Sequence, residues 1–182
     1  MVRISNYAAL LVLALVGALW PASPSRAADA CEFVTLAELE RAFGIPFGNR
    51  YSSKIDNYTD DCMNGGREVP VMVNIVNATL PLGSELTAWR AQRKANMQGL
   101  CEVGAPTGLM GKGTFEMVPD LGEEAYACSL ASLAGPFLAG GMTMLNAAQG
   151  PNIFQIITWE RKPGLVEAMA ALARSALPRL PR

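Results

Sequence analysis

The sequence predicts an α+β fold: a single domain in which about three helices pack against an antiparallel β-sheet. Two periodicities and one turn support this prediction. Apolar residues recur at helical spacing in three segments and alternate in another, and a long apolar stretch is broken by Gln149-Gly150-Pro151, which is typical of a hairpin. The resulting order of helix, strands, helix, strands, helix favours a sheet covered by helices.

The N-terminus predicts a cleavable export signal. Ala8–Trp20 is an unbroken apolar run, shorter than the roughly 20 residues of a membrane-spanning helix. Ser25 and Ala27 place small side chains at positions −3 and −1 of a cleavage site,. We therefore expect residues 1–27 to be a signal peptide. Residues 28–182 would then form one disulfide-bonded α+β domain, periplasmic or secreted, without stable membrane insertion.

Two other fates of this segment fit the sequence less well. An uncleaved anchor would need a longer apolar run than this one. Lipidation at Cys31 would need a leucine-like residue three positions earlier, but Ala28 stands there and the apolar run ends at Trp20,.

Charge and missing residue types exclude several classes of function. Removal of the signal leaves 13 basic and 16 acidic side chains, a net charge of −3 without a basic cluster, so we expect no nucleic-acid partner. The chain has no histidine, which excludes Ser-His-Asp and Cys-His catalysis. Nucleophile-elbow, phosphate-loop and dinucleotide motifs are also missing from the sequence,. We assign no catalytic, cofactor-binding or metal-binding residues and expect no cofactor.

The cysteines predict two disulfide bonds. All four, Cys31, Cys62, Cys101 and Cys128, follow the signal, and an even number in an exported chain is typical of disulfides. Three pairings are possible. Cys31 with Cys62 and Cys101 with Cys128 are favoured because each pair joins elements close in sequence order.

The first half of the domain contains one well-marked helix and one strand. Thr35 and Glu38 form a capping box, and Gly44 ends the helix,. Residues 47–68 are polar and are predicted to be a loop. Val69 to Val76 alternates with a period of two, and Pro70 indicates either the start of this strand or a sheet edge,.

The second half contributes two helices and three strands. A helix is predicted from Ser84 to about Gln98, with Gly99 as its end. Residues 100–119, rich in glycine and proline, are predicted to be a long loop that could gate a cleft,. A strand is predicted over 123–130, and the two arms of the hairpin over 142–148 and 152–159,. A last helix is predicted over 163–177,.

Acidic pairs and methionines offer two candidate chemistries. Three pairs of acidic residues would support a carboxylate-dependent hydrolase only if two carboxyl groups faced one cleft. These pairs are Asp60 with Asp61, Glu123 with Glu124, and Glu38 with Glu40. Adjacent strand residues point to opposite faces, so solvated acids are expected. Met142 and Met144 share one strand face, which suits either core packing or a Cu(I) site,.

Two segments resemble a group of small exported bacterial proteins of unknown function with a cysteine-led first helix. Cys31-Glu32-Phe33-Val34-Thr35-Leu36-Ala37-Glu38 is similar to their opening helix, and Cys62 follows where their second cysteine stands. Leu121-Gly122-Glu123-Glu124-Ala125 is similar to their strand entry, although Asp120 replaces a usual glycine and the second cysteine pair is extra. The resemblance implies an α+β sandwich and supports the Cys31–Cys62 bond.

These observations together favour a non-enzymatic binding module. The expected partner is a small apolar ligand or an envelope protein, with Trp89 and Trp159 as candidate aromatic contacts,. A carboxylate-dependent hydrolase and a methionine-based Cu(I)-binding protein are the alternatives.

The intact mass of the exported protein tests the predicted processing. We expect a chain that begins at Ala28, carries no lipid and shows the hydrogen deficit of two disulfides. An intact N-terminus or free thiols in the denatured mass spectrum would contradict the export prediction.

Overall fold

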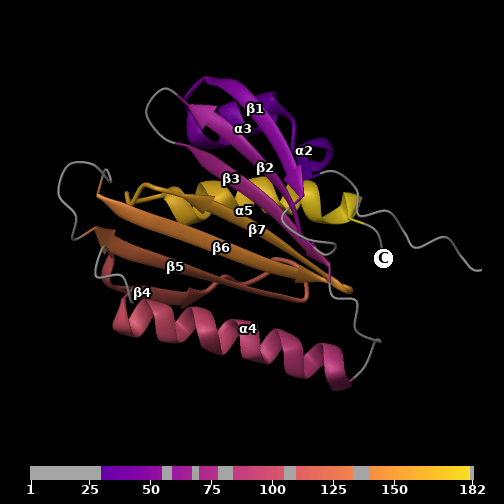
Figure 1. Ribbon diagram of the computed structural model, residues 1–182, viewed down its shortest axis with the longest axis vertical. Coiled ribbons are helices and arrows are strands. Elements are labelled where there is room, and N and C mark those ends of the chain that lie inside the picture. Colours follow the sequence, from indigo (N-terminus) through magenta and orange to yellow (C-terminus); the bar gives the residue numbers. More distant parts are fainter. Residues whose placement is uncertain are drawn as a thin grey trace, which may run out of the picture.

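A computed structural model describes residues 30–54, 59–66, 70–77, 84–104, 110–132 and 140–180. They form a seven-stranded antiparallel sheet with the strand order β1-β2-β3-β7-β6-β5-β4 (Figure 1). The strands are β1 (Phe47–Lys54), β2 (Thr59–Gly66), β3 (Val71–Asn77), β4 (Met110–Met117), β5 (Glu124–Ser132), β6 (Gly141–Gln149) and β7 (Asn152–Thr158). The helices are α2 (Ala30–Phe33), α3 (Leu36–Phe43), α4 (Ser84–Val103), α5 (Leu165–Ala176) and the 3-10 turn η3 (Leu177–Arg179). The predicted α+β class is confirmed.

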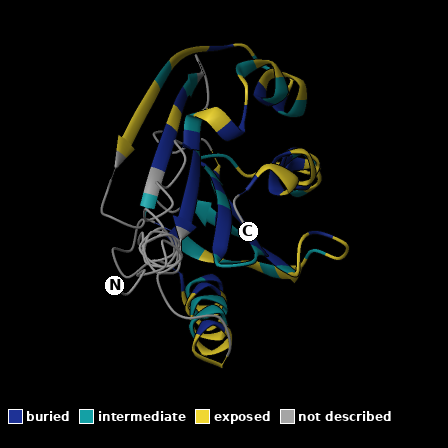
Figure 2. Cartoon of the chain, turned by 90° about the vertical axis from the view of Figure 1, so that its right-hand side faces the viewer, coloured by how far each residue is buried: buried dark blue, intermediate teal, exposed yellow. Residues whose placement is uncertain are grey.

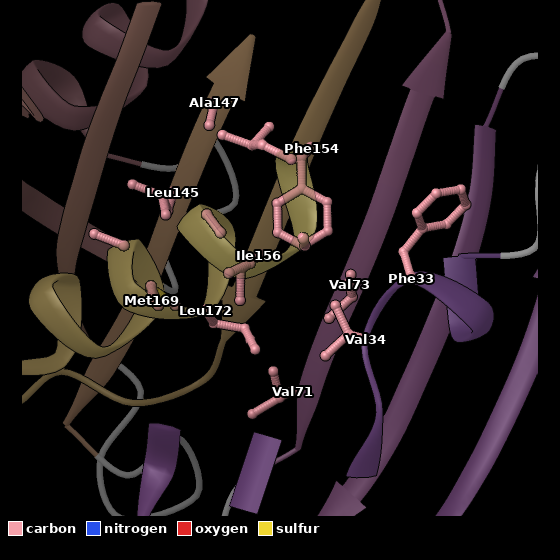
Figure 3. Close-up of a cluster of buried hydrophobic side chains, with 14 of the residues drawn as sticks. Phe33, Val34, Val71, Val73, Leu145, Ala147, Phe154, Ile156, Met169 and Leu172 are labelled. Carbon is pink, nitrogen blue, oxygen red and sulfur yellow. The ribbon is translucent and has the colours of Figure 1, made fainter. Parts of the chain in front are cut away.

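One face of the sheet carries the main hydrophobic core. Successive strand residues point to opposite faces, so Val71 and Val73 of β3 and Phe154 and Ile156 of β7 lie on the same side. They pack with residues of α2, α3 and α5, among them Met169 (Figure 3). Figure 2 shows that the central strands are largely buried, whereas the edge strand β1 and the outer sides of the helices are exposed.

Helix α4 packs on the opposite face, over β4 and β5. Tyr126, Cys128 and Leu130 alternate with Ala125 and Ala127, which face the main core. The disulfide between Cys101 of α4 and Cys128 therefore lies on the second face, within a separate apolar cluster.

Both predicted disulfides are confirmed. Cys31–Cys62 joins α2 to β2, with Cα atoms 4.9 Å apart. Cys101–Cys128 joins α4 to β5, with Cα atoms 5.9 Å apart. Their loops span 31 and 27 residues, so each bond contributes about 3 kcal/mol by restricting the unfolded chain. Two disulfides are compatible with an oxidising compartment.

The capping box of α3 is present as predicted. Glu38 N donates to Thr35 Oγ1 at 3.2 Å, Thr35 N donates to Glu38 Oε2 at 2.8 Å, and Gly44 ends the helix in the left-handed conformation. Glu38 also pairs with Arg179 after α5. The cap satisfies backbone groups that the helix leaves unpaired. The Glu38 carboxylate therefore caps the start of α3 and also connects this helix to the C-terminal segment through Arg179.

Most of the other predicted elements lie where expected. Strand β3 begins directly after Pro70, which marks a strand start and not a sheet edge because β3 lies between β2 and β7. The hairpin turns at Gly150 and Pro151. Helix α5 begins at Leu165, two residues after Pro163. The predicted signal peptide lies outside the described residues.

The predicted loop at 47–68 is wrong. Most of this segment forms β1 and β2. Its polar composition reflects the position of β1 at the sheet edge, where side chains such as Tyr51 are exposed to solvent. Pairing with β3 and the bond at Cys62 hold β2 in the sheet, so tertiary contacts override weak strand propensity.

The predicted long loop at 100–119 is also wrong. Helix α4 continues through Gly99 to Val103, and Met110–Met117 forms β4. Gly113 is a loop signal in the sequence, but a Cβ there would lie 2.2 Å from Ser129 O on β5. Glycine therefore permits close strand pairing at this point, and these segments do not provide a gate over a cleft.

No helix within the described ranges is long and apolar enough to span a membrane.

Replacing Gly113 tests the β4–β5 pairing. Gly113→Ala forces the two strands apart and is expected to lower the free energy of unfolding by about 2–3 kcal/mol. Gly48→Ala on β1 is the matched control, because its Cβ would meet nothing within 4 Å and should change stability by less than about 1 kcal/mol. Equal effects in urea unfolding would contradict this pairing.

Glu38 makes stability depend on pH. Hydrogen bonds from Arg179, followed by those from Thr35, outweigh the opposing effect of burial and lower the pKa of Glu38 from 4.5 to about 2. Because the folded pKa lies below the ordinary value, ionised Glu38 stabilises the fold above pH 4.5 and this contribution is lost as the pH falls towards 2.

Glu38→Gln is therefore expected to cost about 1 kcal/mol at neutral pH, since both partners are partly exposed and screened,. The cost should shrink on acidification. Denaturant unfolding across this pH range measures it, with exposed Glu116→Gln as the control. A cost that does not change with pH would contradict the assigned pKa.

Candidate functional site

A row of polar side chains crosses the sheet face on which α4 packs. The register pairs Tyr126 with Asn146, Asn146 with Gln155, Gln155 with Asn74, and Asn74 with Asp61. The row therefore runs over five adjacent strands at one level. Every member except Gln155 is buried. Buried polar groups are costly unless they are paired, so the partner of each one matters.

The β2–β3–β7 part of the row is hydrogen-bonded within itself. With its amide nitrogen towards Asp61, Asn74 donates to Asp61 Oδ1 at 2.9 Å and to Val73 O at 3.2 Å, and its oxygen faces the Gln155 amide at 3.0 Å. The opposite orientation lets Asn74 Nδ2 donate to Gln155 Oε1 at 3.0 Å but sets its oxygen against Asp61 Oδ1. The first orientation avoids contact between the Asn74 and Asp61 oxygens, and it requires the Gln155 amide to turn as well, so that its nitrogen replaces Oε1 opposite the Asn74 oxygen,.

The β6–β5 part of the row is not satisfied. Asn146 Nδ2 donates to Met97 Sδ at 2.9 Å, but Asn146 Oδ1 and Tyr126 Oη lack hydrogen-bond partners among the described residues. Asn146 is 4% exposed and Tyr126 is 2% exposed. An unpaired buried polar atom costs about 1–3 kcal/mol, so the fold bears a cost here that a bound group could relieve.

A pocket opens beside Asn146, between α4 and strands β6 and β7. Its volume is about 320 Å³, at the lower end of the range for small-molecule sites. Its lining combines amides, thioethers and one cation, contributed by Arg93, Asn96, Met97, Leu100, Met144, Asn146 and Gln155. Such a mixture suits an amphipathic ligand better than the purely apolar one expected from the sequence.

Arg93 gives this region a positive charge. Its guanidinium lies over the ring of Trp89, 5.2 Å from the ring centroid, which holds the cation in place. Burial raises the pKa of the nearby Tyr126 phenol and the charge of Glu124 adds to that rise, while the charge of Arg93 and the adjoining Asn146 side chain oppose it. Tyr126 therefore stays neutral at physiological pH and can donate a hydrogen bond.

The two tryptophans have different surroundings. Trp89 is half-buried and packs against Val76, Ala148 and Ile153. It reaches the site only through its contact with Arg93. Trp159 is half-buried at the end of β7 and does not line the pocket.

The methionine cluster contains more residues than Met142 and Met144, the two that the sequence indicated. Met97 of α4 and Met110 of β4 join the same apolar cluster, next to the Cys101–Cys128 disulfide. Met97 and Met144 also line the pocket. Thioethers from three different elements therefore meet on the α4 side of the sheet.

The acidic pairs do not converge on this pocket. Glu123 pairs with Arg90 at 2.6 Å and Glu124 with Lys94 at 2.7 Å. The hydrogen bond from Arg90 is the largest cause that lowers the pKa of Glu123. Glu38 is held in the α3 cap, and Glu40 accepts from the backbone N–H of Phe47. Asp61 is part of the polar row, and the side chain of Asp60 lies outside the described residues.

A larger hollow of about 1090 Å³ lies between α4 and the β4–β5 turn. Arg90 and Lys94 line it together with the glutamates that neutralise them. Arg90 also bonds Gly150 O, and Glu123 accepts from Gly150 N at 2.9 Å. These contacts fasten α4 to the sheet, so we interpret this hollow as structural.

The sequence carried a signal for the polar row. Asn146 and Gln155 are polar residues in otherwise apolar strands, each three positions from the hairpin ends Gln149 and Asn152. A hairpin register derived from that turn would have placed them opposite each other. Sequence reasoning followed the apolar residues and missed both amides.

Comparison of the chain with protein-family models, curated proteins and solved structures found no match. Within the described ranges, no three or more Cys, Asp or Glu side chains gather in a way that could hold a metal ion. The interpretation of the site therefore depends on its geometry.

Proposed function

We propose that this chain is an exported, non-enzymatic binding protein of the periplasm or of the extracellular space. It would hold a small amphipathic molecule in the pocket between α4 and the sheet. The observation that carries the proposal is Asn146, a residue of the pocket lining whose Oδ1 is buried and lacks a hydrogen-bond partner among the described residues. A fold keeps such a destabilising group when the group has a partner to bind.

The lining defines the class of ligand. Asn146 Oδ1 requires a hydrogen-bond donor, whereas Met97, Met144 and Leu100 require an apolar part,. Arg93 favours an acceptor or an anionic group at the pocket edge,. A molecule with an amide, amine or hydroxyl group next to a short apolar body meets these demands.

Cu(I) binding is the second candidate, because Met97, Met110, Met142 and Met144 share one cluster and soft thioethers suit this ion. It is less favoured because Met97 Sδ already accepts a hydrogen bond from Asn146. A carboxylate-dependent hydrolase has less support, because Glu123 and Glu124 are each neutralised by a cation of α4.

Asn146→Leu distinguishes a binding residue from a structural one. Removal of an unpaired buried oxygen is expected to leave the free energy of unfolding unchanged or to raise it by about 1 kcal/mol. The same substitution should abolish retention of the ligand. Native mass spectrometry of the protein purified from its own compartment measures retention, and thermal unfolding measures stability.

Gln98→Leu, on α4 but outside the pocket lining, is the control and should retain the ligand. An adduct with the mass of one copper ion, lost in Met97→Leu and Met144→Leu, would favour the second candidate. A bare wild-type protein together with a destabilised Asn146→Leu variant would show that Asn146 is structural.

A further inference from the structure

The two disulfides lie in different chemical surroundings. Cys101 and Cys128 are both buried in the α4 cluster, 1% and 0% exposed. In the other bond Cys62 is 0% exposed but Cys31 is partly exposed. The Cys31–Cys62 bond therefore has one partly exposed cysteine, whereas the protein covers both cysteines of the other pair.

A cation lies against the buried sulfur of the accessible bond. Arg50 Nε is 3.2 Å from Cys62 Sγ and donates to Asn64 Oδ1 at 3.0 Å, and a terminal nitrogen of Arg50 bonds Val34 O. Three contacts therefore hold the guanidinium in place. Asn64 brings a second N–H group to within 3.7 Å of the same sulfur.

The strand register builds this arrangement. Arg50 of β1 pairs with Asn64 of β2, and Cys62 lies two pairs further along, opposite Ser52. Residues two apart on a strand share a face, so Arg50, Cys62 and Asn64 all point towards α2. The cation is part of the sheet and is not a mobile surface charge.

We propose that Cys31–Cys62 is a thiol-exchange site at which an external thiol attacks Cys31 and Arg50 stabilises the departing Cys62 thiolate. The attacking thiolate forms a bond to Cys31 Sγ, the Cys31–Cys62 bond breaks, and its electron pair leaves on Cys62 Sγ. A second thiol then releases Cys31, so the two external thiols are oxidised to a disulfide and the protein is reduced by two electrons.

This chemistry fits a chain without histidine. Thiol–disulfide exchange speeds up when the leaving sulfur is stabilised as a thiolate, and neighbouring cations supply that stabilisation without any proton transfer by a base. Exchange would open the covalent tie between α2 and β2. It would leave α4 attached to β5 by the other disulfide.

Limited reduction of the folded protein tests the proposal. Reduced glutathione at neutral pH, followed by alkylation and peptide mass spectrometry, should open Cys31–Cys62 about tenfold or more faster than Cys101–Cys128. The glutathione adduct should be found on Cys31. Dithiothreitol, a dithiol, should carry the same reaction through to free Cys31 and Cys62.

Variants of Arg50 show whether the disulfide opens quickly because Arg50 stabilises the Cys62 thiolate or only because Cys31 is exposed. Arg50→Gln should slow opening about tenfold, and Arg50→Lys, which keeps the charge, should stay within about threefold of the wild-type rate. Exposed Arg41→Gln on α3 is the charge-matched control and should react like the wild type.

Three results would overturn the proposal: equal opening of the two disulfides, an adduct on Cys62, or an Arg50→Gln variant that reacts as fast as the wild type or faster. The last result would show that Arg50 only holds the structure together, because loosening of its contacts to Val34 and Asn64 would expose the bond. The wild-type comparison of the two disulfides needs no variant to fold.

Discussion

The alternation of side chains across one seven-stranded sheet is the constraint on which the rest of this structure depends. Strands β3, β5, β6 and β7 send apolar residues to the face of α2, α3 and α5 and a different set to the face of α4. The first face is a continuous apolar core. The second face combines an apolar cluster with a polar row. Tyr126 Oη and Asn146 Oδ1, two buried atoms without a partner among the described residues, lie together on the second face, whereas Thr158 Oγ1 lies on the first,. We therefore seek the function on the second face.

The two disulfides fasten helices to opposite faces of this sheet. Cys31–Cys62 joins α2 to β2 on the main-core face, and Cys101–Cys128 joins α4 to β5 on the other face. The second bond, with the ion pairs Arg90–Glu123 and Lys94–Glu124, holds the wall of the candidate pocket in position. A pocket formed between separately anchored elements keeps its shape without a ligand, which lowers the entropic cost of binding.

The candidate pocket and the proposed exchange site lie on opposite faces and use different chemistry. Asn146 faces α4, whereas Arg50 and Cys62 face α2. Reduction of Cys31–Cys62 would loosen α2 without touching the pocket lining, since Cys101–Cys128 supports α4. The proposed binding and the proposed thiol exchange can therefore be tested separately.

The sequence by itself determined the features that depend on neighbours along the chain. The Thr35–Glu38 capping box and the turn at Gly150 act over a few residues, so the start of α3 and the β6–β7 hairpin were predictable. Their local free energy favours one conformation before any tertiary contact forms.

Only the tertiary structure decided β1, β2, β4 and the extension of the polar row beyond the hairpin pair Asn146–Gln155. The two edge strands and β2 are polar or glycine-rich and become strands because distant segments pair with them,. Asn74, Gln155 and Asn146 come from three strands, and two strand registers bring them together. Arg50 likewise reaches Cys62 only through the pairing of β1 with β2. Such contacts join residues far apart in sequence, and the free energy of packing both faces of the sheet sets them.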